Sequence, residues 1–493
     1  MGKIVKESAR STTISYIGVV ISFISAVLIM PKLLAPDEIG VLRVILAISG
    51  TFAGLFSLGI SQLVFRTYKT YRDQNPSGYS SMILLVSFAG CLLSIPFFLY
   101  YDLGIGKFDG AISDIIGTAL LSILVYVMIV SRIFYISFEA LVRMTKSITF
   151  MAVMQNLYLK GMPIIFLGLY YFDLINFDGF LVLYIVLFII APLILVVYLR
   201  RKEDLKFGSL PTYTREEKRH LFSLGGFGLL NTIAAALLLY IDTLMVNEYL
   251  KEALAGVYTT MYLFGSVVAV PSRSLKLISG VFIVEALKDG DTKKVEEINQ
   301  KSSQSLLVVS GLIFALVWGN IGSITGYLDE AYSIGIYVVL FIGLAQLFDV
   351  FAGMSSEIIS ASKYYWLHTP ITMVTITVAI IANIYFIPEM GVTGAAIATF
   401  ISFGVLHLSR MISVMILFKI SPFNTKILLG TIFATLVIVG TSYLPSVGNI
   451  YIQLIYKTAL IGTTYGLLMY IFRISPDVNN LAQKFIPFLK RKG

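Results

Sequence analysis

The sequence predicts an all-α integral membrane protein of about 14 transmembrane helices, with two six-helix lobes followed by two C-terminal helices. Three observations support this class. Hydrophobic residues make up 57% of the 493-residue chain and charged residues only 13%, whereas about a quarter of a soluble domain is charged. Apolar stretches long enough to cross a bilayer recur along the chain. Lys and Arg gather in alternate connecting segments, as cytoplasmic loops do.

Each predicted span is an apolar stretch of roughly 20 residues, bounded by charged or turn-forming residues. The first six spans are 11–34, 39–63, 79–101, 114–137, 148–171 and 178–199. The next six are 221–246, 254–275, 303–324, 333–354, 366–387 and 391–417. The last two are 425–446 and 449–472.

The distribution of basic residues predicts the orientation. An even number of spans places both termini on one side, and the segments on that side hold 30 of the 37 Lys and Arg residues. The opposite loops hold only Lys32, Lys107 and Lys251. Because cytoplasmic loops are enriched in Lys and Arg, both termini are expected in the cytoplasm. This placement also explains the net charge of +9 without a nucleic-acid partner.

The longest connection between spans in the first half, residues 200–220, predicts the domain organisation. We expect an N-terminal lobe (1–199), a cytoplasmic linker (200–220), a C-terminal lobe (221–420), helices 13 and 14 (421–472) and a cytoplasmic tail (473–493). A short repeat supports two lobes, since Gly40-Val41 matches Gly256-Val257 at an offset of 216 residues. Parallel repeats of this kind place a transport site between the halves near the bilayer midplane.

Several motifs are absent from the sequence. It has no phosphate-binding loop, no HExxH motif and no cysteine cluster, and its three histidines are isolated. The predicted outer loops are too short for a soluble catalytic domain. We therefore expect neither an enzyme nor a metal protein, and no cofactor, although coupling to Na⁺ or H⁺ is compatible with the pattern.

Lys160 is the most informative residue, because it lies at the middle of span 148–171. A lysine at the bilayer centre costs about 2.5–3.5 kcal/mol on insertion scales. Asn156 lies one turn before it, and Pro163 leaves the carbonyl of Leu159 without its helical donor. Such a polar helix face is tolerated toward protein or a water-filled cavity. We expect Lys160 to line a cavity, the alternative being a buried ion pair.

Further basic residues lie within spans or at their inner ends: Lys457 could reach outward to lipid, Lys276 is expected as an anchor, and His407 as a hydrogen-bonded packing residue. Arg43, near the outer end of span 39–63, either lines an outer vestibule or reaches the interface. Arg132 is expected to pair with Glu139 at the cytoplasmic rim, seven residues later. Arg273 is expected at the inner end of span 254–275, in the same rim or gate.

Two acidic residues also lie within spans. Asp349, deep in span 333–354, is either an ion or proton site or the partner of a cationic residue. Asp242 lies near the outer end of span 221–246, where water reaches it more easily.

Four segments resemble bacterial polysaccharide flippases of the multidrug/oligosaccharidyl-lipid/polysaccharide exporter superfamily. In residues 33–68, an acidic turn and a glycine precede the second helix, and a Leu-Gly pair ends it before a basic loop. In 237–264, an aspartate is followed by the Gly-x-Tyr that opens the eighth helix. Residues 387–403 contain Pro and then Gly-x-x-Gly-Ala-Ala. Residues 285–298 resemble the segment after helix 8, with Val284-Glu285 where proline is frequent.

The resemblance implies a MATE-like fold and alternating access. It further implies flipping of undecaprenyl-diphosphate-linked oligosaccharides, the repeat units of surface polysaccharides such as the O-antigen of lipopolysaccharide, across the bacterial inner membrane. Glycosyltransferases and a glycan polymerase of the same pathway would be partners. On this hypothesis Lys160 contacts the diphosphate midway and Arg43 receives it near the outer mouth, while sugar hydroxyls bond to Gln155, Asn156 and Tyr158.

Two alternatives stay open at this point. A cation-coupled multidrug exporter would share the fold, but the basic residues within the spans fit a cationic drug poorly. A membrane-embedded glycan polymerase or ligase would need a catalytic outer loop with clustered arginines, and the outer loops are short and mostly acidic.

Overall fold

The computed structural model describes residues 2–72, 75–104, 118–145, 147–202, 205–206, 208–210, 213–445 and 448–485. Within these residues the regular secondary structure is entirely helical. The chain divides into two compact units. The first comprises Met1–Asn247 with Lys251–Gly256, and the second comprises Glu248–Leu250 with Val257–Gly493.

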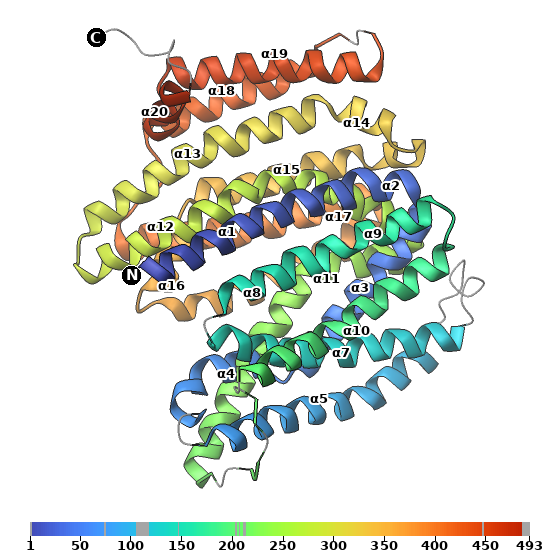
Figure 1. Cartoon of the computed structure of the whole chain (residues 1–493). Coiled ribbons are helices and arrows are strands. Elements are labelled where there is room, and N and C mark those ends of the chain that lie inside the picture. The colour runs from blue at the N-terminus through green and yellow to red at the C-terminus, as the bar shows by residue number, and fades with distance from the viewer. Residues whose placement is uncertain are drawn as a thin grey trace. The chain divides into compact units, whose positions relative to one another are not determined.

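The first unit contains the helices before α11 and the first part of α11 itself (Figure 1). Their bounds are α1 (Gly2–Phe23), η1 (Ile24–Ile29), α2 (Met30–Leu33), α3 (Pro36–Phe56), α4 (Ile60–Thr67), η2 (Tyr68–Arg72), α5 (Pro76–Gly104), α7 (Thr118–Met144), α8 (Ile148–Ala152), η3 (Val153–Tyr158), α9 (Leu159–Tyr171), α10 (Phe177–Arg201) and α11 (Arg215–Ser266).

The second unit contains the rest of α11 and the helices that follow it. Helices α13, α18 and α19 pack side by side, and α20 lies against α13 (Figure 1). The bounds are η4 (Val267–Ala269), α12 (Val270–Lys288), α13 (Thr292–Gly319), α14 (Ile321–Tyr327), η5 (Glu330–Gly335), α15 (Ile336–Ala352), α16 (Ser355–Ala361), η6 (Tyr365–Leu367), α17 (His368–Phe418), α18 (Thr425–Thr441), α19 (Ile450–Ile471) and α20 (Pro476–Phe485).

The described residues contain 11 helices that are long and apolar enough to cross a membrane. Two of them hold two spans each, because Arg215–Lys276 is broken at Lys251 and Tyr365–Phe418 is broken at Gly391. With the shorter apolar helix Thr425–Thr441, these segments match the 14 predicted spans one for one. The prediction of an all-α membrane protein is thus confirmed.

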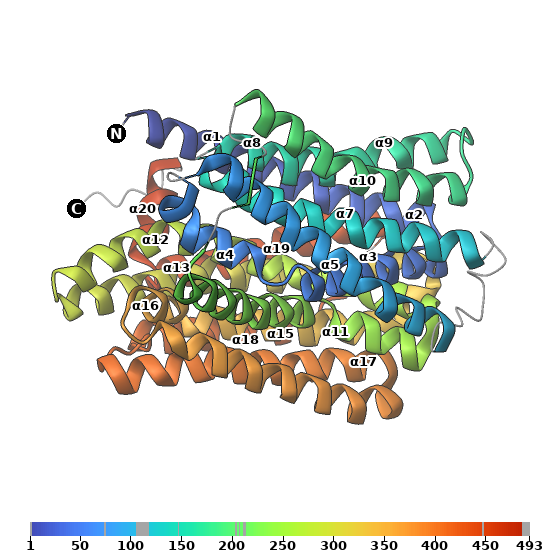
Figure 2. The same cartoon turned by 90° about the horizontal axis from the view of Figure 1, so that it is seen from below.

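The breaks between paired helices have local causes. Extended Ala35 precedes Pro36, whose fixed φ suits the first helical position. Lys251 (φ 74°, ψ 177°) and Gly391 (φ 60°, ψ −138°) have non-helical backbone within α11 and α17. At Gly391 the chain folds back, so that α17 is a hairpin of two arms (Figure 2).

Helix boundaries in the two halves repeat at the 216-residue offset found in the sequence. The non-helical residues Ala35 and Lys251, which precede the second and eighth spans, differ by 216 positions. The third and ninth spans begin at Pro76 and Thr292, again 216 apart. The sixth begins at Phe177 and the twelfth directly after Gly391, within one residue of the offset. The offset therefore relates the starts of the second, third and sixth spans to those of the eighth, ninth and twelfth.

The repeat produces a reciprocal contact within the first unit. A Cβ added to Gly40 would lie 1.8 Å from the carbonyl oxygen of Glu252, and a Cβ added to Gly256 would lie 1.8 Å from that of Pro36. Pro36 and Glu252 are also 216 residues apart. Each glycine therefore contacts the residue that is equivalent, in the repeat, to the one contacted by the other glycine. The Gly-Val match in the sequence marks two backbones that approach too closely for any side chain.

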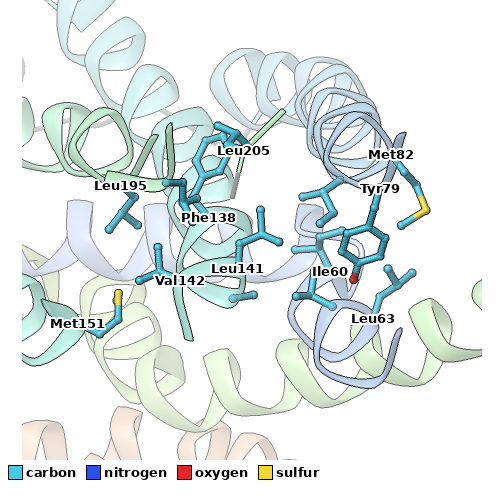
Figure 3. Packing of buried hydrophobic residues seen from close by; sticks show 14 of the residues in the cluster. Ile60, Leu63, Tyr79, Met82, Phe138, Leu141, Val142, Met151, Leu195 and Leu205 are labelled. Atoms are coloured by element: carbon cyan, nitrogen blue, oxygen red, sulfur yellow. The ribbon is translucent and has the colours of Figure 1, made fainter. Parts of the chain in front are cut away.

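A buried apolar cluster of the first unit joins α4, α5, α7, α8 and α10 (Figure 3). Ile60, Tyr79, Leu141 and Leu195 are at most 3% exposed. The hydroxyl of Tyr79 lies 3.0 Å from Oγ1 of Thr67, so its one polar group has a partner. This cluster holds these five helices of the first unit together.

The boundary between the compact units differs from the predicted lobe boundary. Residues 221–247 cluster with the first unit, whereas the prediction counts them in the second lobe and places the division at 200–220. The arrangement as two six-helix lobes and a C-terminal pair stays a prediction.

Candidate functional site

Lys160 lies where span 148–171 changes its helical pitch. The segment Val153–Tyr158 is a π-helix, and α9 begins directly after it. Nζ of the half-buried Lys160 donates a hydrogen bond of 3.0 Å to Oδ1 of Asn156. Single π-helical turns inside α-helices are frequent at functional sites, because they redirect side chains. Here the π-helical turn ends at Tyr158, two residues before Lys160.

Asn156 faces α1. It is 7% exposed, and its Nδ2 donates to the carbonyl oxygen of Ala152 at 3.0 Å. A Cβ on Gly18 would lie 2.2 Å from Cβ of Asn156, so the absence of a side chain at Gly18 lets the two helices meet there. Asn156 therefore orients Lys160 from the packed side of the helix, and a role in sugar binding stays a prediction.

Glu139 accepts hydrogen bonds from two neighbours. Nε2 of Gln155 donates to its Oε1 at 2.5 Å, and Nη2 of Arg143 lies 2.5 Å from the same oxygen. Arg132 does not take part, since its contacts lie elsewhere. The predicted Arg132–Glu139 pair is wrong, because a residue four positions away reaches across one helical turn, whereas one seven positions away must reach across two.

Tyr158 bonds to a neighbouring helix. Its hydroxyl donates to the carbonyl oxygen of Leu187 on α10 at 3.0 Å. The contact holds the end of the π-turn against α10. Contact of Tyr158 with substrate stays a prediction.

A cationic cluster inside the first unit surrounds Tyr184. Nη1 of Arg132 donates to the carbonyl oxygen of Leu46 at 2.8 Å, and its guanidinium lies 4.5 Å from the ring centroid of Phe188. Arg43 and Arg132 both lie within electrostatic range of the buried Tyr184 hydroxyl. The cluster thus combines two arginines that the sequence analysis assigned to opposite ends of the membrane.

Gly50 makes room for this cluster. A Cβ at Gly50 would lie 2.4 Å from Cε2 of Tyr240 and 2.9 Å from Nη1 of Arg132. The small-residue stretch around Gly50 therefore admits a cationic side chain between helices of the first unit. Its sequence signal, a glycine in an apolar helix, is common and did not point to Arg132.

Asp349 has three polar partners in the second unit. It forms a salt bridge with Lys276, Oγ of Ser272 donates to its Oδ2 at 2.5 Å, and Nδ1 of His407 lies 3.2 Å from its Oδ1. Asp349 is thus the partner of a cationic residue, and its role as an ion or proton site stays a prediction. Lys276, expected as an anchor, and His407, expected as a packing residue, both belong to this cluster.

The remaining predicted residues lie apart from these clusters. Arg273 is exposed on α12, and Asp242 is half-buried on α11. Lys457, expected to reach outward from α19, is instead 9% exposed. It shares a helix face with Ile461 and Tyr465, which pack against α13. Lys107 lies outside the described residues.

An apolar groove of about 580 Å³ opens on the second unit between α15, α17 and α18. Its lining includes Phe348, Phe351, Leu408 and Leu428, with Asn424 and Thr425 at the start of α18. No group of three or more His, Cys, Asp or Glu side chains is placed to hold a metal ion within the residues that the structure describes.

The fold defines the class of a multi-pass helical membrane protein. No protein-family model matches the chain. A probable flippase, AglR of Haloferax volcanii, is 26% identical over 194 residues, 38% of this chain and 40% of the relative. A probable low-salt glycan biosynthesis flippase, Agl15 of the same organism, is 22% identical over 275 residues, 53% of this chain and 55% of the relative. The chain thus spans about half the length of these relatives.

Solved structures share the fold over most of the chain. The lipid II flippase MurJ in an inward closed conformation matches with a TM-score of 0.68 and 14% identity, covering 95% of this chain and 98% of MurJ. An inward-facing multidrug resistance MATE transporter of the MOP superfamily matches with a TM-score of 0.58 and 12% identity, covering 82% of this chain and 98% of the transporter. The predicted MATE-like fold is confirmed.

Proposed function

We propose that this protein flips a lipid-linked oligosaccharide from one leaflet of the membrane to the other by alternating access. The observation that carries the proposal is the cationic cluster of the first unit. Among the described residues, Arg132 contacts a carbonyl oxygen and an aromatic ring but no carboxylate. A positive charge held inside a membrane-spanning unit without a carboxylate favours an anionic ligand. The phosphate groups of a lipid carrier have that charge.

The embedded cations of the two units differ in their partners. Lys276 in the second unit is paired with Asp349, so its charge is compensated. Arg132 has no carboxylate partner among the described residues. We therefore assign the phosphate group to the first unit, with Arg132, Arg43 and Lys160 as its cations. The names of the two Haloferax relatives, both flippases, support a glycan carrier as the substrate.

The finer features of the proposal come from the sequence pattern and its resemblance to polysaccharide flippases. They are an undecaprenyl-diphosphate carrier, a bacterial inner membrane, cytoplasmic termini, and polymerase and glycosyltransferase partners of the same pathway. The apolar groove between α15, α17 and α18 would receive part of the long lipid chain. Coupling to an H⁺ or Na⁺ gradient would supply the driving force.

The test is flipping of a fluorescent lipid-linked oligosaccharide in proteoliposomes that contain the full chain. Arg132→Gln should slow flipping about tenfold or more, because a hydrogen bond to a charged group contributes about 1.5–3 kcal/mol. Arg143→Gln is the matched control, since Arg143 lies at the surface and pairs with Glu139. Lys160→Gln should also slow flipping.

Equal rates for Arg132→Gln and the wild type, at equal protein level, would overturn the assignment of the phosphate site. Transport of cationic dyes without flipping would instead favour the multidrug exporter, which shares the fold.

A further inference from the structure

The polar cluster around Asp349 extends over three elements of the second unit. Ser272 and Lys276 come from α12, Asp349 from α15 and His407 from α17. The side chains of Lys276 and Asp349 are only 16% and 14% exposed. Most of both groups is therefore surrounded by protein.

Further charged side chains lie near this pair. Glu357 on α16 lies within electrostatic range of Lys276, Asp349 and Arg410, and Arg410 is within range of Asp349 and Glu357. Burial raises the pKa of Glu357 above its usual value. His368, at the start of α17, is within range of Arg410. Arg273 is exposed on α12.

The internal repeat supplies a comparison from within the same chain. Subtracting 216 from the numbers of the six central cluster residues gives a set of apolar positions in the first half. Those positions are Phe56, Ile60, Ile133, Leu141, Ala191 and Ile194. Ile60, Leu141 and Ala191 belong to the apolar cluster of the first unit, and Ile194 packs against it. Ile60 and Leu141 are labelled in Figure 3.

At these positions the first copy is apolar, whereas the second carries polar and charged side chains. The register holds on both sides of the cluster, because η2 ends at Arg72 and α12 ends at Lys288, again 216 apart. Since apolar side chains fill these positions in the first unit, packing of the fold does not require charges there. Buried charges are costly unless they are paired, so their presence calls for a function.

The geometry of the cluster also favours a proton over a metal cation as the bound ion. A sodium ion would need oxygen ligands around it, whereas the carboxylate of Asp349 already faces an ammonium, a hydroxyl and an imidazole. A proton needs only one basic atom. Glu357, Asp349 and His407 each offer one.

We propose that the Ser272–Lys276–Asp349–His407 cluster, with Glu357 and Arg410 beside it, is a proton-exchange site that drives the conformational cycle of the second unit. With both carboxylates ionised and His407 neutral, the two cations and two anions balance. One proton from water, bound at His407 or at a carboxylate, leaves the cluster with one positive charge. The added charge weakens the Lys276–Asp349 attraction, and release of the proton restores it.

This inference rests on the proposed function only in naming transport as the process that the proton drives. The first experiment therefore uses no substrate. Difference infrared spectroscopy of the purified full chain, between about pH 8 and about pH 5, records protonation of carboxyl and imidazole groups. The wild type should show signals that Asp349→Asn and His407→Gln alter.

The decisive variant removes both members of the pair. A single charge removal leaves the other charge buried and risks misfolding, whereas replacing both with apolar residues is often tolerated. Lys276→Met/Asp349→Leu should fold and lose the cluster's infrared signals. In proteoliposomes, the ratio of flipping rates with and without a pH gradient should fall to about one, because coupling requires the proton site.

Identical infrared titrations for the wild type and the double variant would overturn the proposal. So would a double variant that keeps its full response to the pH gradient, or a wild type driven by a Na⁺ gradient at constant pH. If no lipid-linked oligosaccharide is flipped but the infrared signals behave as expected, the proposed function fails and the proton site stands.

Discussion

Replacing Gly256 by alanine should destabilise the first unit through its contact with α3. The new Cβ would lie 1.8 Å from the carbonyl oxygen of Pro36, whereas ordinary van der Waals contact begins at 3.4 Å. The two atoms must therefore move apart by about 1.6 Å. Overpacking of this kind costs about 1–3 kcal/mol. Alanine returns about 0.5–1 kcal/mol of helix propensity, so the net loss should be about 1–2 kcal/mol.

The reciprocal contact predicts the effect of a second substitution. Gly40→Ala meets the carbonyl oxygen of Glu252 at the same 1.8 Å and should cost a similar amount. The two substitutions share one interface and should not add. Once the backbones have separated for the first methyl group, the second needs little further movement, so the double variant should be more stable than the sum predicts.

The assay is the apparent melting temperature of the purified full chain in one detergent, followed by the fluorescence of the native tryptophans. Gly168→Ala on α9 is the matched control, because no heavy atom lies within 4 Å of its added Cβ. It should melt at or slightly above the wild-type temperature. The reasoning fails if Gly256→Ala melts as the control does, or if the double variant loses the full sum.

Three further substitutions should lower the apparent melting temperature in the same assay. Tyr465→Phe removes a buried hydrogen bond of 2.9 Å to the carbonyl oxygen of Leu307 and should cost about 1 kcal/mol; an unchanged temperature would mean that the bond contributes nothing. Asn424→Ala removes the N-cap bond of 3.0 Å from the backbone N–H of Ile427 and should cost about 0.5–2 kcal/mol, with Asn424→Ser largely restoring stability. Gly59→Ala forces a side chain onto a backbone with φ of 70° and should cost at least about 1–2 kcal/mol; a stabilised variant would contradict this.

The sequence by itself determined the membrane class, the 14 spans and the position of their breaks. Apolar length and the placement of Pro36, Lys251 and Gly391 are local properties, which a chain expresses wherever its helices pack. The offset of 216 residues was visible in a single Gly-Val pair. The structure extends that offset to the helix boundaries of both halves and explains the pair as a close backbone contact.

Only the tertiary structure decided which charged residues meet. Lys276 and Asp349 are 73 residues apart along the chain, and no spacing rule relates positions on different helices. For the same reason the sequence predicted a pair of Arg132 with Glu139. In the structure the Arg132 guanidinium instead donates to the carbonyl oxygen of Leu46 on another helix. Partner choice depends on how helices pack, because an unpaired charge inside a membrane protein is costly. The sequence located the charges, and packing determined which of them are compensated.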